Sequence, residues 1–183
     1  MNCFLIGFML LFGCDKGVTN KMDKRKPTRL HTYDYSSNGT YFLTLCTHNR
    51  RKILSKIVVG QGLGPAEIRL TDYGKIAELY INDITNRFPR IHVDKYVIMP
   101  DHIHFLISIL NPTTAGASPC PTLSDVMCAY KSLTTRACKK IYPIDKLFQD
   151  SFYDHIIRNQ SDYRESWHYI ERNPYRWIEK HKV

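Results

Sequence analysis

The chain has 183 residues, a formal net charge of +9 and an ordinary hydrophobic fraction of 43%. This length suits one domain that buries about 70% of its unfolded surface, and the apolar fraction argues against intrinsic disorder. We expect residues 22–183 to form that single domain.

The positive charge is concentrated at the two flanks of the chain. Residues 21–60 carry a net charge of +7 and residues 130–183 a net charge of +4, whereas residues 61–129 carry −2. Basic flanks around a nearly neutral middle fit a polyanion that lies along one surface. A solvated basic face explains the same composition, so charge alone leaves both interpretations open.

Residues 1–21 begin with an apolar block, MNCFLIGFMLLFGC, that is too short to span a membrane. It resembles a signal peptide with a lipoprotein-type cleavage box, but it lacks the charged segment that normally precedes one. We interpret 1–21 as an N-terminal extension from a translation start assigned too far upstream, with a signal-like segment as the alternative. The six cysteines show no Cys-x-x-Cys and no zinc-finger spacing, which indicates reduced thiols in a cytoplasmic protein.

The first half of the chain predicts a strand followed by a helix. Residues 40–47 are rich in β-branched and aromatic side chains and predict a buried strand, with a basic turn at 48–52 after it. A Gly-rich loop at 60–65 comes next. Residues 71–88 then keep helical spacing, with Thr71 as the expected N-cap.

The second half predicts a hairpin, a helix, a strand and a last helix. The expected elements are strands at 91–99 and 102–110, a loop at 111–121, a helix at 122–141, a strand at 152–158 and a helix at 161–173. We expect Pro174 to end the last helix, because proline disfavours helical geometry in the residue before it. This order predicts an α+β fold of ferredoxin-like type, an antiparallel sheet with helices packed on one face.

His102 and His104 flank Ile103 at the start of an apolar run. In an extended strand both imidazoles project to one side and Ile103 projects to the other, so the pair can reach one cation. The plainer interpretation is two hydrogen-bonded polar residues on a strand, and the short motif alone favours it.

Tyr169 and Asn173 stand four residues apart and share one face of the predicted helix. If that face lies over His102 and His104, two imidazoles, an amide oxygen and a phenol converge. Three neutral ligands would hold a divalent metal, Mg²⁺ or Mn²⁺, with positions left for water and a phosphate oxygen, and the phenol becomes a candidate nucleophile. A packed tyrosine and an ordinary helix terminus are the plainer interpretations.

Further motifs occur in a fixed order from about residue 24 to residue 180. They are RL (29–30), YDY (33–35), YFLTLCT (41–47), YVIMPDHIH (96–104), YKSLT (130–134), FYDHIIR (152–158), and Tyr169-Ile170 with Asn173-Pro174 and Trp177. Taken together they resemble the HUH-superfamily tyrosine transposases, in particular the REP-associated branch related to small insertion-sequence transposases.

The resemblance assigns roles to residues of this chain. It implies that His102 and His104, on a central strand, are metal ligands and that Tyr169 is the catalytic nucleophile. Asn173 falls where the insertion-sequence enzymes carry a glutamine as third ligand, and it is one methylene shorter. The family often has Asn at the position of Asp101, which we interpret here as a turn residue rather than a support for His102.

The resemblance also implies a substrate of single-stranded or hairpin DNA, cut so that the enzyme is left on the 5′ phosphate. Two groups of basic residues fit such a substrate: Arg50, Arg51, Lys52, Lys131, Arg136, Lys139 and Lys140. We therefore expect a cytoplasmic, nucleoid-associated DNA strand transferase, without a membrane partner and either monomeric or homodimeric. A DNA-binding protein of the same fold without turnover is the alternative, and a hydrolase using the histidines alone would need further ligands that the sequence does not offer at motif spacing.

Overall fold

The computed structural model describes residues 38–59, 66–110 and 121–181, so the expected extension at 1–21 and the loops at 60–65 and 111–120 lie outside it. The strands are β1 (Gly39–Cys46), β2 (Ser55–Val59), β3 (Ala66–Leu70), β4 (Ile91–Ile98), β5 (His102–Ile109) and β6 (Tyr153–Ile157). The helices are α2 (Asp72–Asn82), α3 (Ile84–Arg87), α4 (Leu123–Lys139) and α5 (Gln160–His181). No helix in these described ranges is both long enough and apolar enough to cross a bilayer.

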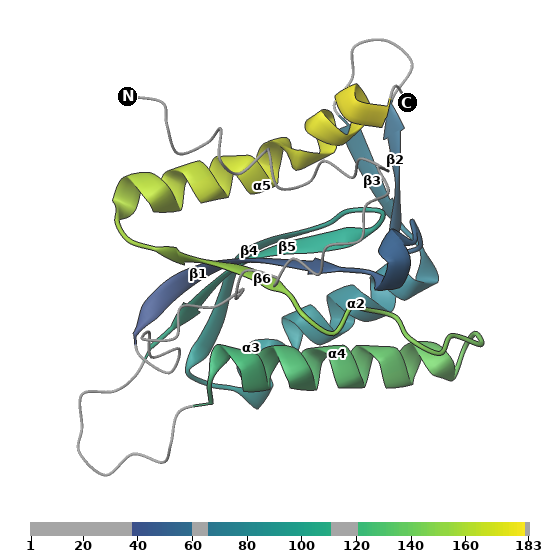
Figure 1. Ribbon diagram of the computed structural model, residues 1–183, viewed down its shortest axis with the longest axis horizontal. Helices are drawn as coiled ribbons and strands as arrows, with labels where there is room; N and C mark the ends of the chain where they lie inside the picture. Colours follow the sequence, from purple (N-terminus) through teal and green to yellow (C-terminus); the bar gives the residue numbers. More distant parts are fainter. Residues whose placement is uncertain (1–37, 60–65, 111–120, 182–183) are drawn as a thin grey trace, which may run out of the picture.

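The main sheet is antiparallel, with strand order β4-β5-β1-β6, and β2 and β3 pair separately as a hairpin (Figure 1). Apart from that hairpin and α5, the elements follow one another as β-α-β-β-α-β, the ferredoxin-like order. The predicted α+β fold is therefore confirmed, and β5 is a central strand.

The helices cover both faces of the sheet rather than the one face that we expected. Helices α2, α3 and α4 lie on one side, and α5 lies alone on the other (Figure 1). The reason is that the central strands are apolar on both sides: Leu43 and Phe105 join the larger core cluster, whereas Phe42 and Leu106 join the smaller one under α5. A sheet that is apolar on both faces needs a cover on each.

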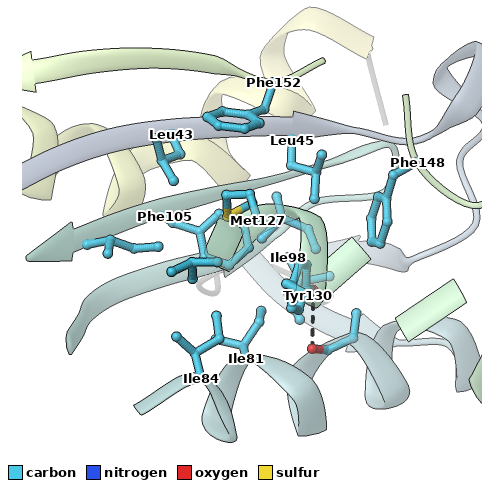
Figure 2. Packing of buried hydrophobic residues seen from close by; sticks show 14 of the residues in the cluster. Leu43, Leu45, Ile81, Ile84, Ile98, Phe105, Met127, Tyr130, Phe148 and Phe152 are labelled. Atoms are coloured by element: carbon cyan, nitrogen blue, oxygen red, sulfur yellow. Dashed lines mark hydrogen bonds between the residues drawn. The ribbon is translucent and has the colours of Figure 1, made fainter. Parts of the chain in front are cut away.

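The larger core lies between the sheet and helices α2 and α4 (Figure 2). Leu43, Leu45 and Phe105 from the strands meet Met127 and Tyr130 from α4, and all five are almost fully buried. The Tyr130 hydroxyl donates a hydrogen bond to the Ala77 carbonyl of α2, which ties the two helices together. Burial on this scale makes the α2–α4 layer the rigid base on which the opposite face is built.

Three local features differ from the sequence expectation. The helix expected at 71–88 is divided at Asp83 into α2 and α3. The hairpin β2–β3 was missed, although alternating apolar residues flank the Gly-rich loop. Helix α5 continues through Pro174 to His181, because the turns beyond the proline are held by Trp177 and Ile178 in the smaller core.

Gly74 allows α2 to approach the backbone before β2. The N-cap Thr71 accepts a hydrogen bond from the Gly74 N–H, and a Cβ at position 74 would lie 2.0 Å from the Leu54 carbonyl oxygen. We expect Gly74→Ala to lower the free energy of unfolding by about 1–3 kcal/mol, since α2 must shift to relieve the clash. Chemical denaturation measures this, with Lys75→Ala at the exposed neighbouring position as the control; equal stability of the two variants would contradict the packing.

Candidate active site

Strand β5 directs His102 and His104 to the face under α5. His102 pairs across the sheet with Cys46 and His104 with Thr44, while Ile103 joins the larger core on the other face. Both histidines are buried, with 8% and 4% of their surface exposed. The alternation predicted from the sequence therefore places both imidazoles on one side of a rigid central strand.

Each imidazole has its Nδ1 atom engaged and its Nε2 atom turned toward the other ring. The His102 Nδ1 lies 2.6 Å from Oδ1 of Asp101, and the His104 Nδ1 lies 2.9 Å from the Thr44 hydroxyl. The two Nε2 atoms are 3.1 Å apart. An ionised Asp101 accepts the Nδ1–H of His102, which leaves the Nε2 lone pair pointing at the space between the rings.

Burial keeps both imidazoles neutral. It lowers the pKa of His102, and the hydrogen bond to Asp101 opposes that shift only in part. Burial also lowers the pKa of His104 well below its usual value, and the nearby His102 adds to this effect. Neutral imidazoles are the form that binds a metal ion.

Asp101 is a support for His102 and not only the turn residue that we expected. Besides the bond to His102, its Oδ2 lies 3.2 Å from Nε of Arg50. Burial acts to raise the pKa of Asp101, but the hydrogen bond from His102 and the nearby positive charges outweigh it, so the pKa is lowered. Asn49 and Arg50 have φ angles of 54° and 53°, a left-handed conformation that turns the Arg50 side chain back toward Asp101.

Helix α5 places Tyr169 and Asn173 over the histidines. The rings of Tyr169 and His104 meet edge to face with 5.3 Å between centroids. Asn173 is buried and forms side-chain hydrogen bonds with His102 and with Tyr169. All four groups that the sequence singled out therefore converge within one chain.

Tyr169 lies half-buried between the sheet and Arg176. Its ring packs against Phe42 at 5.6 Å between centroids, and the Arg176 guanidinium carbon lies 4.9 Å from its ring centroid. Burial raises the pKa of Tyr169, and Arg176, which hydrogen-bonds its side chain, opposes that rise most strongly. The phenol is thus protonated at neutral pH and stands beside a fixed positive charge.

The donor set fits one divalent cation. Two ligand atoms at right angles on an octahedral ion with bonds of about 2.1 Å lie about 3 Å apart, and the two Nε2 atoms are separated by 3.1 Å. Within the described ranges no group of three His, Cys, Asp or Glu side chains is arranged to hold a metal. The amide of Asn173, which hydrogen-bonds His102, lies beside the two imidazoles. Imidazole and amide donors together suit Mn²⁺ as well as Mg²⁺.

Comparison with known proteins shows the family of the chain. The family model described as "Transposase IS200 like" matches residues 35–173, a span that contains His102, His104, Tyr169 and Asn173. The chain belongs to the IS200-like transposase family.

Individual relatives of the family support the assignment. An uncharacterized protein of Haemophilus influenzae is 29% identical over 167 residues, covering 84% of this chain and 89% of its own length. A REP-associated tyrosine transposase of Escherichia coli K12 is 24% identical over 148 residues, covering 80% and 73%. A solved structure of a REP-associated tyrosine transposase bound to a REP hairpin superposes with a TM-score of 0.58 and 24% identity over 81% of this chain and 73% of that chain, a likeness of fold.

The basic residues predicted to bind DNA fall into two locations. Arg50 lies at the site, and Lys52 lies beside it, with Nζ 5.4 Å from the Trp177 ring centroid. Arg51 donates hydrogen bonds to the carbonyls of His48 and Lys146, so it also shapes the loop. The others belong to α4 or follow it directly, in the layer opposite α5: Lys131, which donates to the carbonyls of Gln149 and Asp150, and the exposed Arg136, Lys139 and Lys140.

Sequence reasoning missed Arg176 as a neighbour of Tyr169. We expected the last helix to end before Pro174, so residues after the proline were not considered as part of the helix face that carries Tyr169. The signal was present as a spacing: Arg176 follows Tyr169 by seven residues and Asn173 by three, which is one stripe of a continuous helix.

Asp101 offers a direct test of how the imidazoles are held. We expect Asp101→Asn to weaken Mn²⁺ binding about 10- to 100-fold, since an amide supports His102 less strongly than a carboxylate does. Titration calorimetry on the free protein measures this without DNA. Asp145→Asn, at an exposed position, should bind Mn²⁺ like the wild type; equal affinities for all three proteins would show that Asp101 has no part in the site.

Proposed function

We propose that this chain is a single-stranded DNA endonuclease and strand transferase that acts through a 5′-phosphotyrosine intermediate at hairpin or palindromic DNA. The observation that carries the proposal is the position of Tyr169, whose ring lies against His104 while its neighbour Asn173 bonds to His102. This arrangement suits phosphodiester transfer better than a purely binding role, because it brings together a candidate nucleophile, candidate metal ligands and basic groups.

The proposed reaction exchanges one phosphate ester for another. The Tyr169 oxygen attacks the phosphorus, an O–P bond to the phenol forms, and the bond from phosphorus to the 3′ oxygen breaks. The phenolic proton is released to solvent and the departing 3′ oxygen takes up a proton, so the products are a protein-linked 5′ phosphate and a free 3′ hydroxyl. Attack of a 3′ hydroxyl on the same phosphorus reverses these steps and rejoins the strand.

Protein residues would hold the cation and the nucleophile for this reaction. A divalent ion bound by His102, His104 and Asn173 would polarise the phosphodiester and offset the charge that develops on its oxygens. Asp101 and Thr44 fix the orientation of the two imidazoles. Phe42 and the sheet beneath it limit the motion of the Tyr169 ring and keep water from one side of it.

The DNA class rests on charge and on similarity. The net charge of +9 provides sequence-independent affinity for phosphates, and unpaired bases can stack on aromatic residues. A structurally similar transposase is described as bound to a REP hairpin, and we propose a hairpin or palindromic single strand for this chain as well. Such a substrate implies a cytoplasmic protein working at the nucleoid.

Replacement of the nucleophile is the most direct test. We expect Tyr169→Phe to bind metal and DNA but to form no covalent product, because the ring that packs on Phe42 is kept and only the hydroxyl is lost. The assay is incubation of labelled hairpin DNA with Mn²⁺, followed by denaturing electrophoresis. Tyr163→Phe removes a hydroxyl of the same helix that instead contacts Asp94, and it should leave the adduct intact; an adduct mapped by mass spectrometry to another residue would overturn the assignment.

The histidines provide a second, separate test. We expect His102→Ala and His104→Ala each to abolish Mn²⁺-dependent cleavage while DNA binding persists, because basic residues provide most of that affinity. Removal of metal with EDTA should have the same effect on the wild type, and added Mn²⁺ should restore cleavage. Cleavage near the wild-type rate by either variant would end the metal proposal, whereas binding without cleavage by the wild type would favour the alternative of a DNA-binding protein without turnover.

A further inference from the structure

Arg176 of α5 is exposed, and its side chain lies over the half-buried ring of Tyr169. Its guanidinium carbon lies 4.9 Å from the centroid of the Tyr169 ring, and its side chain hydrogen-bonds that of Tyr169. An exposed arginine has many accessible rotamers, so this position reflects attraction to the ring face and to the phenol oxygen. Helical geometry supports it, because Arg176 follows Tyr169 by about two turns of α5.

Arg50 is a second guanidinium at the candidate active site, and it comes from the loop after β1 rather than from α5. It follows β1, and its left-handed backbone directs the side chain to Asp101 and Cys46, with Nε 3.2 Å from Oδ2 and Nη1 2.7 Å from Sγ. Its positive charge also acts, as a minor contribution, to lower the pKa of Tyr169, of His102 and of His104. Arg50 therefore lies on Asp101, the acid that bonds to His102, with 39% of its side chain exposed.

We propose that Arg50 and Arg176 form an anion site around the Tyr169 hydroxyl that binds the non-bridging oxygens of the scissile phosphodiester. The inference rests on the proposed function, and it names the groups that receive the phosphate. A phosphodiester carries one negative charge, and a second develops while the phenol oxygen and the 3′ oxygen exchange places on phosphorus. Guanidinium groups recognise phosphate through paired N–H donors and keep their charge at every working pH.

The same pair accounts for both directions of the reaction. During attack, Arg176 holds the phenol oxygen in line and balances the charge that grows on phosphate; during rejoining it balances the charge of the departing phenolate. Arg50 balances the buried Asp101 and is still partly exposed, so its guanidinium can also meet a phosphate.

The test compares a charged and a neutral phosphate at one position. Wild-type protein with Mn²⁺ and labelled hairpin DNA first maps the cleavage position. Affinity is then measured in a Tyr169→Phe background, which cannot cut, for two oligonucleotides that carry either the ordinary phosphate or an uncharged methylphosphonate at that position. We expect the methylphosphonate to weaken binding about 10- to 100-fold, the value of a charged hydrogen bond.

The arginine variants decide whether that loss comes from the proposed anion site. Two double variants add Arg176→Gln or Arg50→Gln to Tyr169→Phe. In each, we expect the methylphosphonate to weaken binding only about twofold. The control Arg172→Gln, on an exposed part of α5, should leave the loss of affinity unchanged. Each variant meets both oligonucleotides in the presence of EDTA, so a general change in folding cancels and Mn²⁺ binding does not contribute. If the methylphosphonate weakens binding by the Arg176 variant as much as it does without that change, the anion site is overturned. A covalent DNA adduct of the wild type would still uphold the proposed function in that case. A wild type that forms no adduct overturns both proposals.

Discussion

The contact between α5 and the β1–β5 face is the constraint on which the rest of the site depends. Strand β5 can present two imidazoles by itself, but the proposed third ligand Asn173, the proposed nucleophile Tyr169 and Arg176 all come from a helix that follows the last strand of the sheet. A small apolar cluster around Phe42, Leu106 and Ile170 holds that helix on the sheet, together with polar contacts such as Lys95–Glu171 and Tyr163–Asp94. The position of α5, and so the distance from nucleophile to ligands, is set by that packing.

Electrostatics and burial act together at this interface. Taking the imidazoles out of water removes their positive charge, and the same burial would destabilise the carboxylate of Asp101 if it were alone. His102 and Arg50 bond to its two oxygens and compensate that cost. The result is a chain of contacts from an exposed arginine, through a buried acid, to a neutral ligand, a common arrangement behind metal-binding histidines.

Helices α2 and α4, on the other face of the sheet, support the site only indirectly. Helices α2 and α4 pack on the larger core, and the Tyr130 hydroxyl links them through Ala77. Lys131 of α4 donates to the backbone of Gln149 and Asp150, and the Gln149 N–H in turn bonds to the carbonyl of Cys46 at the end of β1. This layer therefore fixes the end of the strand from which the loop carrying Arg50 departs, although it contributes no group to the site.

The sequence by itself determined the ferredoxin-like order of elements, the common face of His102 and His104, and the shared helical stripe of Tyr169 and Asn173, because these follow from the periods of strands and helices. It did not determine that α5 covers the second face alone, that the helix passes through Pro174, or that Asp101 and Arg50 support His102. Those outcomes depend on contacts between residues far apart in the chain, such as Trp177 in the smaller core and Arg50 on Asp101. Local propensity favours a stop at Pro174, and tertiary packing, which outweighs propensity by burying apolar surface, carries the helix past it. The turn at Pro100-Asp101 forms as its local sequence predicts, and tertiary contacts add the role of Asp101 in holding His102.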